Sequence, residues 1–257
     1  MKFYSLNKEQ RKSLADKIKD EIRSDIRSGK NDRILKYFSD EDTYIRKTAY
    51  TMLGRIYRET ASIHQEIIKQ LDLLLKSPDE RVRQTVINSA GEIGIVNFHE
   101  TEHILAEGLF DKHHSVRNAV IGSMKRIGEK NPAPLLHFAK RFLHHEDGEV
   151  RREICHGLEL LGREHPEEIL PLLKELEHDK TGKVRKMVIH VIGQISYKKG
   201  CLEKVIKHLN TWENAELVGK ALKEIADVHN RYKNFAFYTE ALARKYIEKN
   251  SKYDSAK

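Results

Sequence analysis

Cysteine and proline are scarce in this sequence, and long apolar runs are missing. Five prolines and fourteen glycines among 257 residues exclude a collagen-like or low-complexity chain. The two cysteines, Cys155 and Cys201, form no metal-binding or redox motif, which favours a reducing compartment. No apolar run approaches the roughly 18 residues that cross a bilayer, and residues 1–27 are charged and lack an apolar signal core. These absences predict a cytoplasmic protein with no membrane partner.

Positive charge is in excess, but it is unevenly distributed. The net charge is +8. Residues 1–37 carry 11 basic and 6 acidic side chains, and residues 229–257 carry 7 and 3. Residues 38–228 therefore hold 29 basic and 30 acidic side chains. This balance excludes a uniformly basic surface for nucleic acid, although a basic face opposite an acidic face stays open.

One pattern recurs along the chain: a polar turn, then Val-Arg or Ile-Arg, then an apolar stripe that ends near a glycine. The arginines of the pattern, here called the marker arginines, are separated by 37, 34, 34 and 34 residues. A sixth unit has Gly219 where the arginine is expected. Such a period is typical of stacked helical repeats. The marker arginines are Arg46, Arg83, Arg117, Arg151 and Arg185.

The apolar stripes predict helices, because their residues recur at steps of three and four. Between them lie apolar segments of similar period, so each unit reads as a pair of helices. Aspartates occupy the intervening turns, where carboxylates suit helix N-termini. In the fifth unit the stripe consists of Val184, Met187, Val188, Val191, Ile192 and Ile195.

Over about residues 39–228, the turn aspartate, Val-Arg and trailing glycine resemble the HEAT-repeat family, including its phycobilisome-lyase-like subgroup. The resemblance implies an all-α fold, a right-handed α-α superhelix built as one solenoid over residues 1–257. It also implies that Arg83, Arg117, Arg151 and Arg185 form a structural ladder with turn aspartates. The predicted parts are capping helices in 1–38 (at 7–28 and 31–38), about six repeats in 39–228, and a capping helix at 233–249 with a tail at 250–257, both within 229–257.

The second helix of each pair offers the best candidate binding surface, because in the HEAT family it lines the concave side. The residue after each marker arginine points away from the apolar stripe, and these positions hold cations and amides but no acid. One turn further on, two units carry histidine 34 residues apart, so the two rings are expected to lie close together. The candidate partner-binding residues are Lys47, Arg152, Lys186, Lys220, His156 and His190.

Fourteen histidines raise the question of a metal centre. A HEAT-repeat metalloenzyme class, the deoxyhypusine hydroxylases, uses repeated His-Glu dipeptides on the inner helices. Here the dipeptide occurs only at His99-Glu100 and His145-Glu146, in or near turns or first helices. A metal site also needs three or four ligands. We therefore predict no metal ligands and no cofactor, and a metal-dependent enzyme is the remote alternative.

The architecture is also similar to that of the HEAT-like alkylpurine DNA glycosylases, which are helical solenoids of comparable length. That family uses aromatic residues, often tryptophan, beside a catalytic aspartate. The one tryptophan, Trp212, falls near the end of a first helix, where packing is expected, and no Trp-Asp pair is present. No catalytic residue transfers from this resemblance.

The sequence thus favours a non-catalytic HEAT-repeat scaffold that binds a protein or another acidic partner on its second-helix face. A protein partner is preferred to nucleic acid because residues 38–228 are nearly neutral. A nucleic-acid-binding protein related to the alkylation-repair glycosylases is the alternative, since phosphate contacts need only lysine and arginine.

Overall fold

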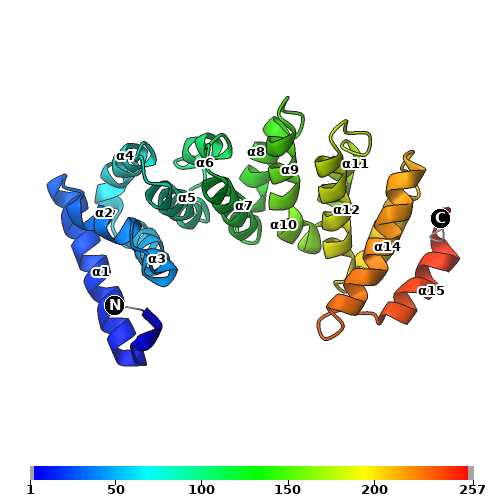
Figure 1. Cartoon of the computed structure of the whole chain (residues 1–257), viewed down its shortest axis with the longest axis horizontal. Helices are drawn as coiled ribbons and strands as arrows, with labels where there is room; N and C mark the ends of the chain where they lie inside the picture. Colours follow the sequence, from blue (N-terminus) through cyan, green and yellow to red (C-terminus); the bar gives the residue numbers. More distant parts are fainter. Residues whose placement is uncertain (1–2, 254–257) are drawn as a thin grey trace. The chain divides into compact units, whose positions relative to one another are not determined.

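The structure is a computed structural model that describes residues 3–253, and these residues form helices and no strand (Figure 1). The chain divides into two compact units, residues 1–135 and residues 136–257, whose boundary falls inside α8 (Pro132–Phe142). Each unit is a stack of helix pairs, which confirms the predicted all-α repeat fold. Within residues 3–253, no helix combines the length and the apolar character needed to cross a membrane.

In the first unit, the helices α3, α5 and α7 pack side by side, and the shorter α2, α4 and α6 pack against them. The first two α-helices correspond to the hairpin expected at residues 7–28 and 31–38. The elements of this unit are η1 (Phe3–Ser5), α1 (Lys8–Ser28), α2 (Asp32–Phe38), α3 (Thr43–Glu59), η2 (Ala61–Ile63), α4 (His64–Leu75), α5 (Glu80–Gly94), α6 (Glu102–Leu109) and α7 (His114–Gly128).

In the second unit, α12 packs against α9 and α10 and also against α14, while α11 packs against α13 (Figure 1). The helix that follows the fourth marker arginine is interrupted at Leu158, so it is split into α9 and α10. The remaining elements are α9 (Gly148–Gly157), α10 (Glu159–Glu164), α11 (Pro166–Lys174), α12 (Gly182–Ser196), α13 (Cys201–Leu209), α14 (Ala215–Arg231) and α15 (Glu240–Asn250).

The apolar stripes form the core, as their period predicts. On α12, all residues of the predicted stripe are fully buried except Met187, which is partly exposed. Trp212 is also fully buried, and its Nε1 donates to Nδ1 of His208 at 2.8 Å. Packing of Trp212 is therefore confirmed.

The closing helix begins later than expected. The pattern predicted a helix from residue 233, but residues 232–239 form a turn and α15 starts at Glu240. Phe235 and Phe237 lie in this turn and are 75% and 51% exposed, so they do not pack as part of the helix.

Part of the predicted tail is held in place. The amide of Lys252 donates to Oδ1 of Asn210 at 2.8 Å, and the Tyr253 hydroxyl donates to the carbonyl of Trp212. The chain after α15 therefore packs back on the end of α13. The remainder of the predicted tail, residues 254–257, lies outside the described residues.

All five marker arginines make the same local contact. Each guanidinium donates to the backbone carbonyl six residues earlier, in the turn two to five residues past the end of the preceding helix. The contact gives a hydrogen-bond donor to a carbonyl of that turn. The pairs are Arg46 with Asp40, Arg83 with Ser77, Arg117 with Asp111, Arg151 with His145, and Arg185 with Asp179.

Two marker arginines also reach the next repeat, as the ladder prediction requires. Arg83 donates to both carboxylate oxygens of Asp111 at 2.6 and 3.0 Å, and Arg151 donates to both oxygens of Asp179 at 2.6 and 2.9 Å. Burial opposes ionisation of both aspartates, yet hydrogen bonds from the guanidinium and from a backbone amide hold each pKa below its ordinary value. We call these two pairs the aspartate clasps.

The aspartate clasp is not universal, for a reason visible in the sequence. Each clasp joins an arginine to the aspartate 28 residues later, and that position is His145 after Arg117 and Glu213 after Arg185. The predicted ladder is therefore confirmed as an aspartate pair for Arg83 and Arg151.

Candidate functional site

The predicted binding row lies on exposed or partly exposed positions of the second helices. Lys47 is exposed on α3 in the first unit. Arg152, Lys186 and Lys220 lie on α9, α12 and α14 of the second unit, where Arg152 is partly exposed and the two lysines are exposed. The second unit thus collects three of the four cations of the row.

Glutamates of the same helices neutralise two of these cations. Arg152 pairs with Glu149 at 2.9 Å and with Glu153 at 3.3 Å, and Lys220 pairs with Glu216, one turn earlier on α14. Within residues 3–253, Lys186 makes no ion pair. Of the three row cations in the second unit, Lys186 is therefore the one most available to a partner.

A cavity of ≈ 220 Å³ opens between α12 and α14, and both row lysines line it. Three cations and one carboxylate surround apolar side chains. Lys220 donates to Glu216, and this contact, together with the nearby Arg185, holds the pKa of Glu216 below its ordinary value. The carboxylate is thus ionised at neutral pH, and the cavity keeps a net positive charge. Its main lining residues are Arg185, Lys186, Ile189, Glu216, Leu217 and Lys220.

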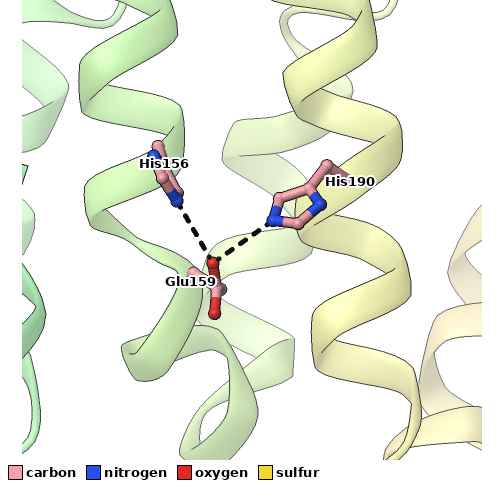
Figure 2. Close-up of side chains that lie close together, drawn as sticks. All are labelled: His156, Glu159 and His190. Carbon is pink, nitrogen blue, oxygen red and sulfur yellow. Dashed lines mark ion pairs between the residues drawn. The ribbon is translucent and has the colours of Figure 1, made fainter. Parts of the chain in front are cut away.

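The two predicted histidines do lie side by side, and they meet at a glutamate that sequence reasoning missed (Figure 2). The rings of His156 on α9 and His190 on α12 are 5.8 Å apart at their centroids and nearly perpendicular. Both direct Nε2 towards Oε2 of Glu159, at 3.5 Å from His156 and 3.6 Å from His190. Within residues 3–253, these three form the one group of three or more His, Cys, Asp and Glu residues that could hold a metal ion, and their ligand atoms lie within 4.8 Å of one another.

Glu159 is almost buried, with 6% of its surface exposed. Nη2 of Arg163, one turn later on α10, donates to its Oε1 at 2.5 Å. The same guanidinium donates to the carbonyl of Gln194 at 3.1 Å and to its side-chain oxygen at 2.8 Å. Arg163 therefore anchors the glutamate to α12 and leaves Oε2 facing the two imidazoles.

The position of Glu159 in the repeat is the signal that would have revealed it. It stands eight residues after the marker arginine, where three other repeats have Gly54, Gly91 and Gly193. A Cβ added at Gly193 would lie 2.7 Å from Cγ of Glu224 on α14, so this position faces the next second helix at close range. An unbroken helix would leave little room for a glutamate at this position. The helix is interrupted one residue earlier, at Leu158.

Other histidines form isolated contacts. His103 pairs with Asp72 at 2.8 Å and His144 pairs with Glu175 at 2.6 Å, both on exposed side chains. Both His-Glu dipeptides lie between helices, His99-Glu100 after α5 and His145-Glu146 after α8. This agrees with their predicted location and separates them from the second-helix face.

Comparison with known proteins places the fold in a recognisable class. Residues 33–135 match the family model described as sister chromatid cohesion protein PDS5. AlkD2 from Streptococcus mutans has a similar structure, with a TM-score of 0.55 and 20% identity over 76% of this chain and 94% of that one. The structure of smu.31 from Streptococcus mutans UA159 gives a TM-score of 0.52 and 20% identity over 66% and 89% of the two chains.

These likenesses confirm the predicted resemblance to HEAT-like repeat proteins, and to the HEAT-like glycosylases in architecture. At 20% identity they show the fold alone. No curated protein matches the sequence significantly.

Proposed function

We propose that the chain is a binding scaffold whose second-helix face takes up an acidic segment of another protein. The observation that carries this proposal is the cavity between α12 and α14, which combines net positive charge with the apolar side chains of Ile189 and Leu217. A carboxylate of the partner segment would be attracted by Lys186 and Lys220. An apolar side chain next to it would be removed from water by packing against the apolar lining of the cavity.

The row residues of the second unit fit this proposal as flanking contacts. Arg152 and the two histidines lie on α9 and α12, beside the helix that carries Lys186. Lys47 lies in the first unit, where it offers an exposed cation at the equivalent repeat position. The description of the matching family, a sister chromatid cohesion protein, also supports a role in binding.

Nucleic acid is the second candidate, supported by the fold likeness to AlkD2 and by the cations of the row. The charge pattern argues against it. Two of the three cations in the second unit already pair with glutamates, and a phosphate backbone would be repelled by Glu149 and Glu216. A peptide that brings only one or two carboxylates meets less repulsion.

Fluorescence anisotropy tests both candidates with defined probes. One probe is a short labelled peptide in which two glutamates alternate with leucines, and the other is a short labelled DNA duplex. Each is titrated at low and near-physiological salt. We expect saturable peptide binding that persists at the higher salt, and DNA binding that falls steeply because it rests on phosphate contacts.

The matched variants are Lys186→Glu and Lys207→Glu. Both replace an exposed lysine of the second unit and change the net charge equally, but Lys207 lies on the first helix α13. We expect Lys186→Glu to weaken peptide binding at least about tenfold, which is about 1.4 kcal/mol, and Lys207→Glu to leave it unchanged. Equal effects of the two variants would contradict the proposed face. DNA binding that survives the higher salt would favour the second candidate.

A further inference from the structure

The His156–Glu159–His190 cluster differs from the other histidine–carboxylate pairs within residues 3–253, because two imidazoles face one carboxylate oxygen. His144 and His103 contact their carboxylates at 2.6 and 2.8 Å, which is the range of a direct hydrogen bond, and the exposed pair His165–Glu168 is 3.6 Å apart. In the cluster, the two imidazoles stop at 3.5 and 3.6 Å from the same oxygen atom. The cluster is therefore not a pair of ordinary hydrogen bonds.

Separations of this size are those of atoms that share a metal ion. A zinc ion about 2.1 Å from each of its ligand atoms, at roughly tetrahedral angles, holds those atoms about 3.4 Å apart. Two of the three separations in the cluster meet this condition, and the third lies within 4.8 Å. Both rings are partly exposed, so their surroundings leave them room to rotate.

We propose that His156, Glu159 and His190 bind one divalent transition-metal ion of the zinc type. Two imidazoles and one carboxylate are a ligand set that zinc accepts, with a further position for water or another ligand. Because both rings are partly exposed, this position can be reached from solvent.

The surroundings of Glu159 supply what a metal ligand needs. All three donors stand on helices rather than loops, so the backbone fixes their spacing. Arg163 holds Oε1 of Glu159 and is itself held by Gln194, which orients Oε2 towards the rings. A carboxylate placed where other repeats have glycine, at the cost of a helix break, also calls for a role beyond packing.

The competing explanation is an ion pair, in which one imidazole is protonated and Glu159 balances its charge. Zinc titration of the full-length protein, followed by calorimetry, separates the two explanations. Cobalt titration followed by visible absorption reports the coordination directly. We expect one zinc ion per chain and a cobalt spectrum typical of tetrahedral coordination.

The variants are His190→Ala, Glu159→Gln and the control His144→Ala. The control removes an exposed histidine that also contacts a glutamate in the same unit. We expect His190→Ala and Glu159→Gln to weaken zinc binding by at least about 100-fold. Replacing a residue that only supports a metal ligand already lowers metal affinity by about 10–100-fold. His144→Ala should bind zinc as the unaltered protein does.

Circular dichroism of each variant checks that the helices are retained. Absence of zinc binding by the unaltered protein would overturn the proposal in favour of the ion pair. Equal losses of zinc affinity in His190→Ala and His144→Ala would overturn it, because zinc would then be bound by scattered surface histidines. The proposal stands apart from peptide binding, because Lys186→Glu should leave the cobalt spectrum of the site intact.

Discussion

The two units build the same helix pairs but fill one repeat position differently. Eight residues after the marker arginine, the first unit has Gly54, Gly91 and Lys125, and the second unit has Glu159 and Gly193. A Cβ at Gly54 would lie 2.5 Å from Cβ of Glu92, and one at Gly91 would lie 2.4 Å from Oγ of Ser123. At these glycines, the backbone of one second helix lies against side chains of the next and leaves no room for a side chain of its own.

Around Glu159 the same contact is rebuilt. The helix is interrupted at Leu158, and the close approach to α12 passes to Gly162, where an added Cβ would lie 2.5 Å from Cδ1 of Ile195. The comparison teaches that a repeat array can accommodate a polar cluster by interrupting one helix. The close contact of Gly162 with Ile195 keeps the neighbouring second helices packed against each other.

The largest effect is expected from the aspartate clasps, which the two units share. Arg83→Ala and Arg151→Ala each leave a nearly buried aspartate without its cation, which should lower the free energy of unfolding by about 3–5 kcal/mol. Arg126→Ala removes a half-exposed cation that lies 3.5 Å from Glu92, and about 1 kcal/mol is expected. Urea denaturation measures all three.

Arg117→Ala sharpens this test. Its guanidinium makes the contact to the carbonyl of Asp111, but the clasp position 28 residues later is His145. We expect a loss between those of Arg151→Ala and Arg126→Ala. Equal midpoints for Arg151→Ala and Arg126→Ala would contradict the structural role of the clasps.

A second effect should come from filling a glycine contact. Gly91→Ala places Cβ 2.7 Å from Cβ of Ser123, so α5 and α7 must move apart, and we expect a loss of about 1–3 kcal/mol. Gly122→Ala is the matched control, because the nearest atom to its added Cβ is 3.7 Å away. The control should be neutral or stabilising by up to about 1 kcal/mol, since alanine favours helices more than glycine does. Thermal unfolding measures both effects. Midpoint temperatures that shift in the same direction in the two variants would contradict the close contact at Gly91.

The clasps also predict a dependence on pH. The folded-state pKa of Asp111 and of Asp179 is lowered, so each aspartate stabilises the fold fully above its unfolded value. That stabilisation is lost as the pH falls from about 5 through the lowered pKa values. Urea midpoints measured from pH 7 to pH 3 should fall less steeply in Asp179→Asn than in the unaltered protein. An identical slope would show that Asp179 titrates alike in the folded and unfolded states.

The smallest effect should come from the cation row of the first unit. Lys47 is exposed on α3, whereas Lys186 lines the cavity beside α14. In the peptide titration, Lys47→Glu should weaken binding only about two- to threefold, because salt screens exposed charges that do not touch the ligand. A loss as large as that of Lys186→Glu would mean that the peptide contacts both positions.

Much of the fold could be predicted because the pattern repeats in register. The marker arginines, the apolar stripe of α12 and the leading helical hairpin all follow from periods of three, four and 34 residues. The same period correctly placed His156 beside His190. The closing helix was predicted too early, because aromatic residues at 235–238 suit a helix by composition but lie in a turn.

The candidate site was harder to predict because its key residue breaks the pattern. Glu159 could be noticed only by asking which residue replaces the glycine of other repeats, and its burial depends on the helix break at Leu158. The pairing of Lys220 with Glu216 was within reach, since four residues separate them on one helix. The cavity beside them depends on how α12 and α14 pack, which no local pattern specifies.

The aspartate clasps also constrain how a chain of this kind can grow or shrink by rearrangement of its gene. Deleting one repeat of 34 residues just after Arg83 would bring His145 to the clasp position, and the clasp would be lost. Deleting two repeats would bring Asp179 to that position and restore it. The hydrogen bond to the carbonyl six residues earlier lies within one repeat and survives either event. Loss of two repeats at this point would therefore leave one complete arginine–aspartate clasp, whereas loss of a single repeat would leave Arg83 without an aspartate at the clasp position.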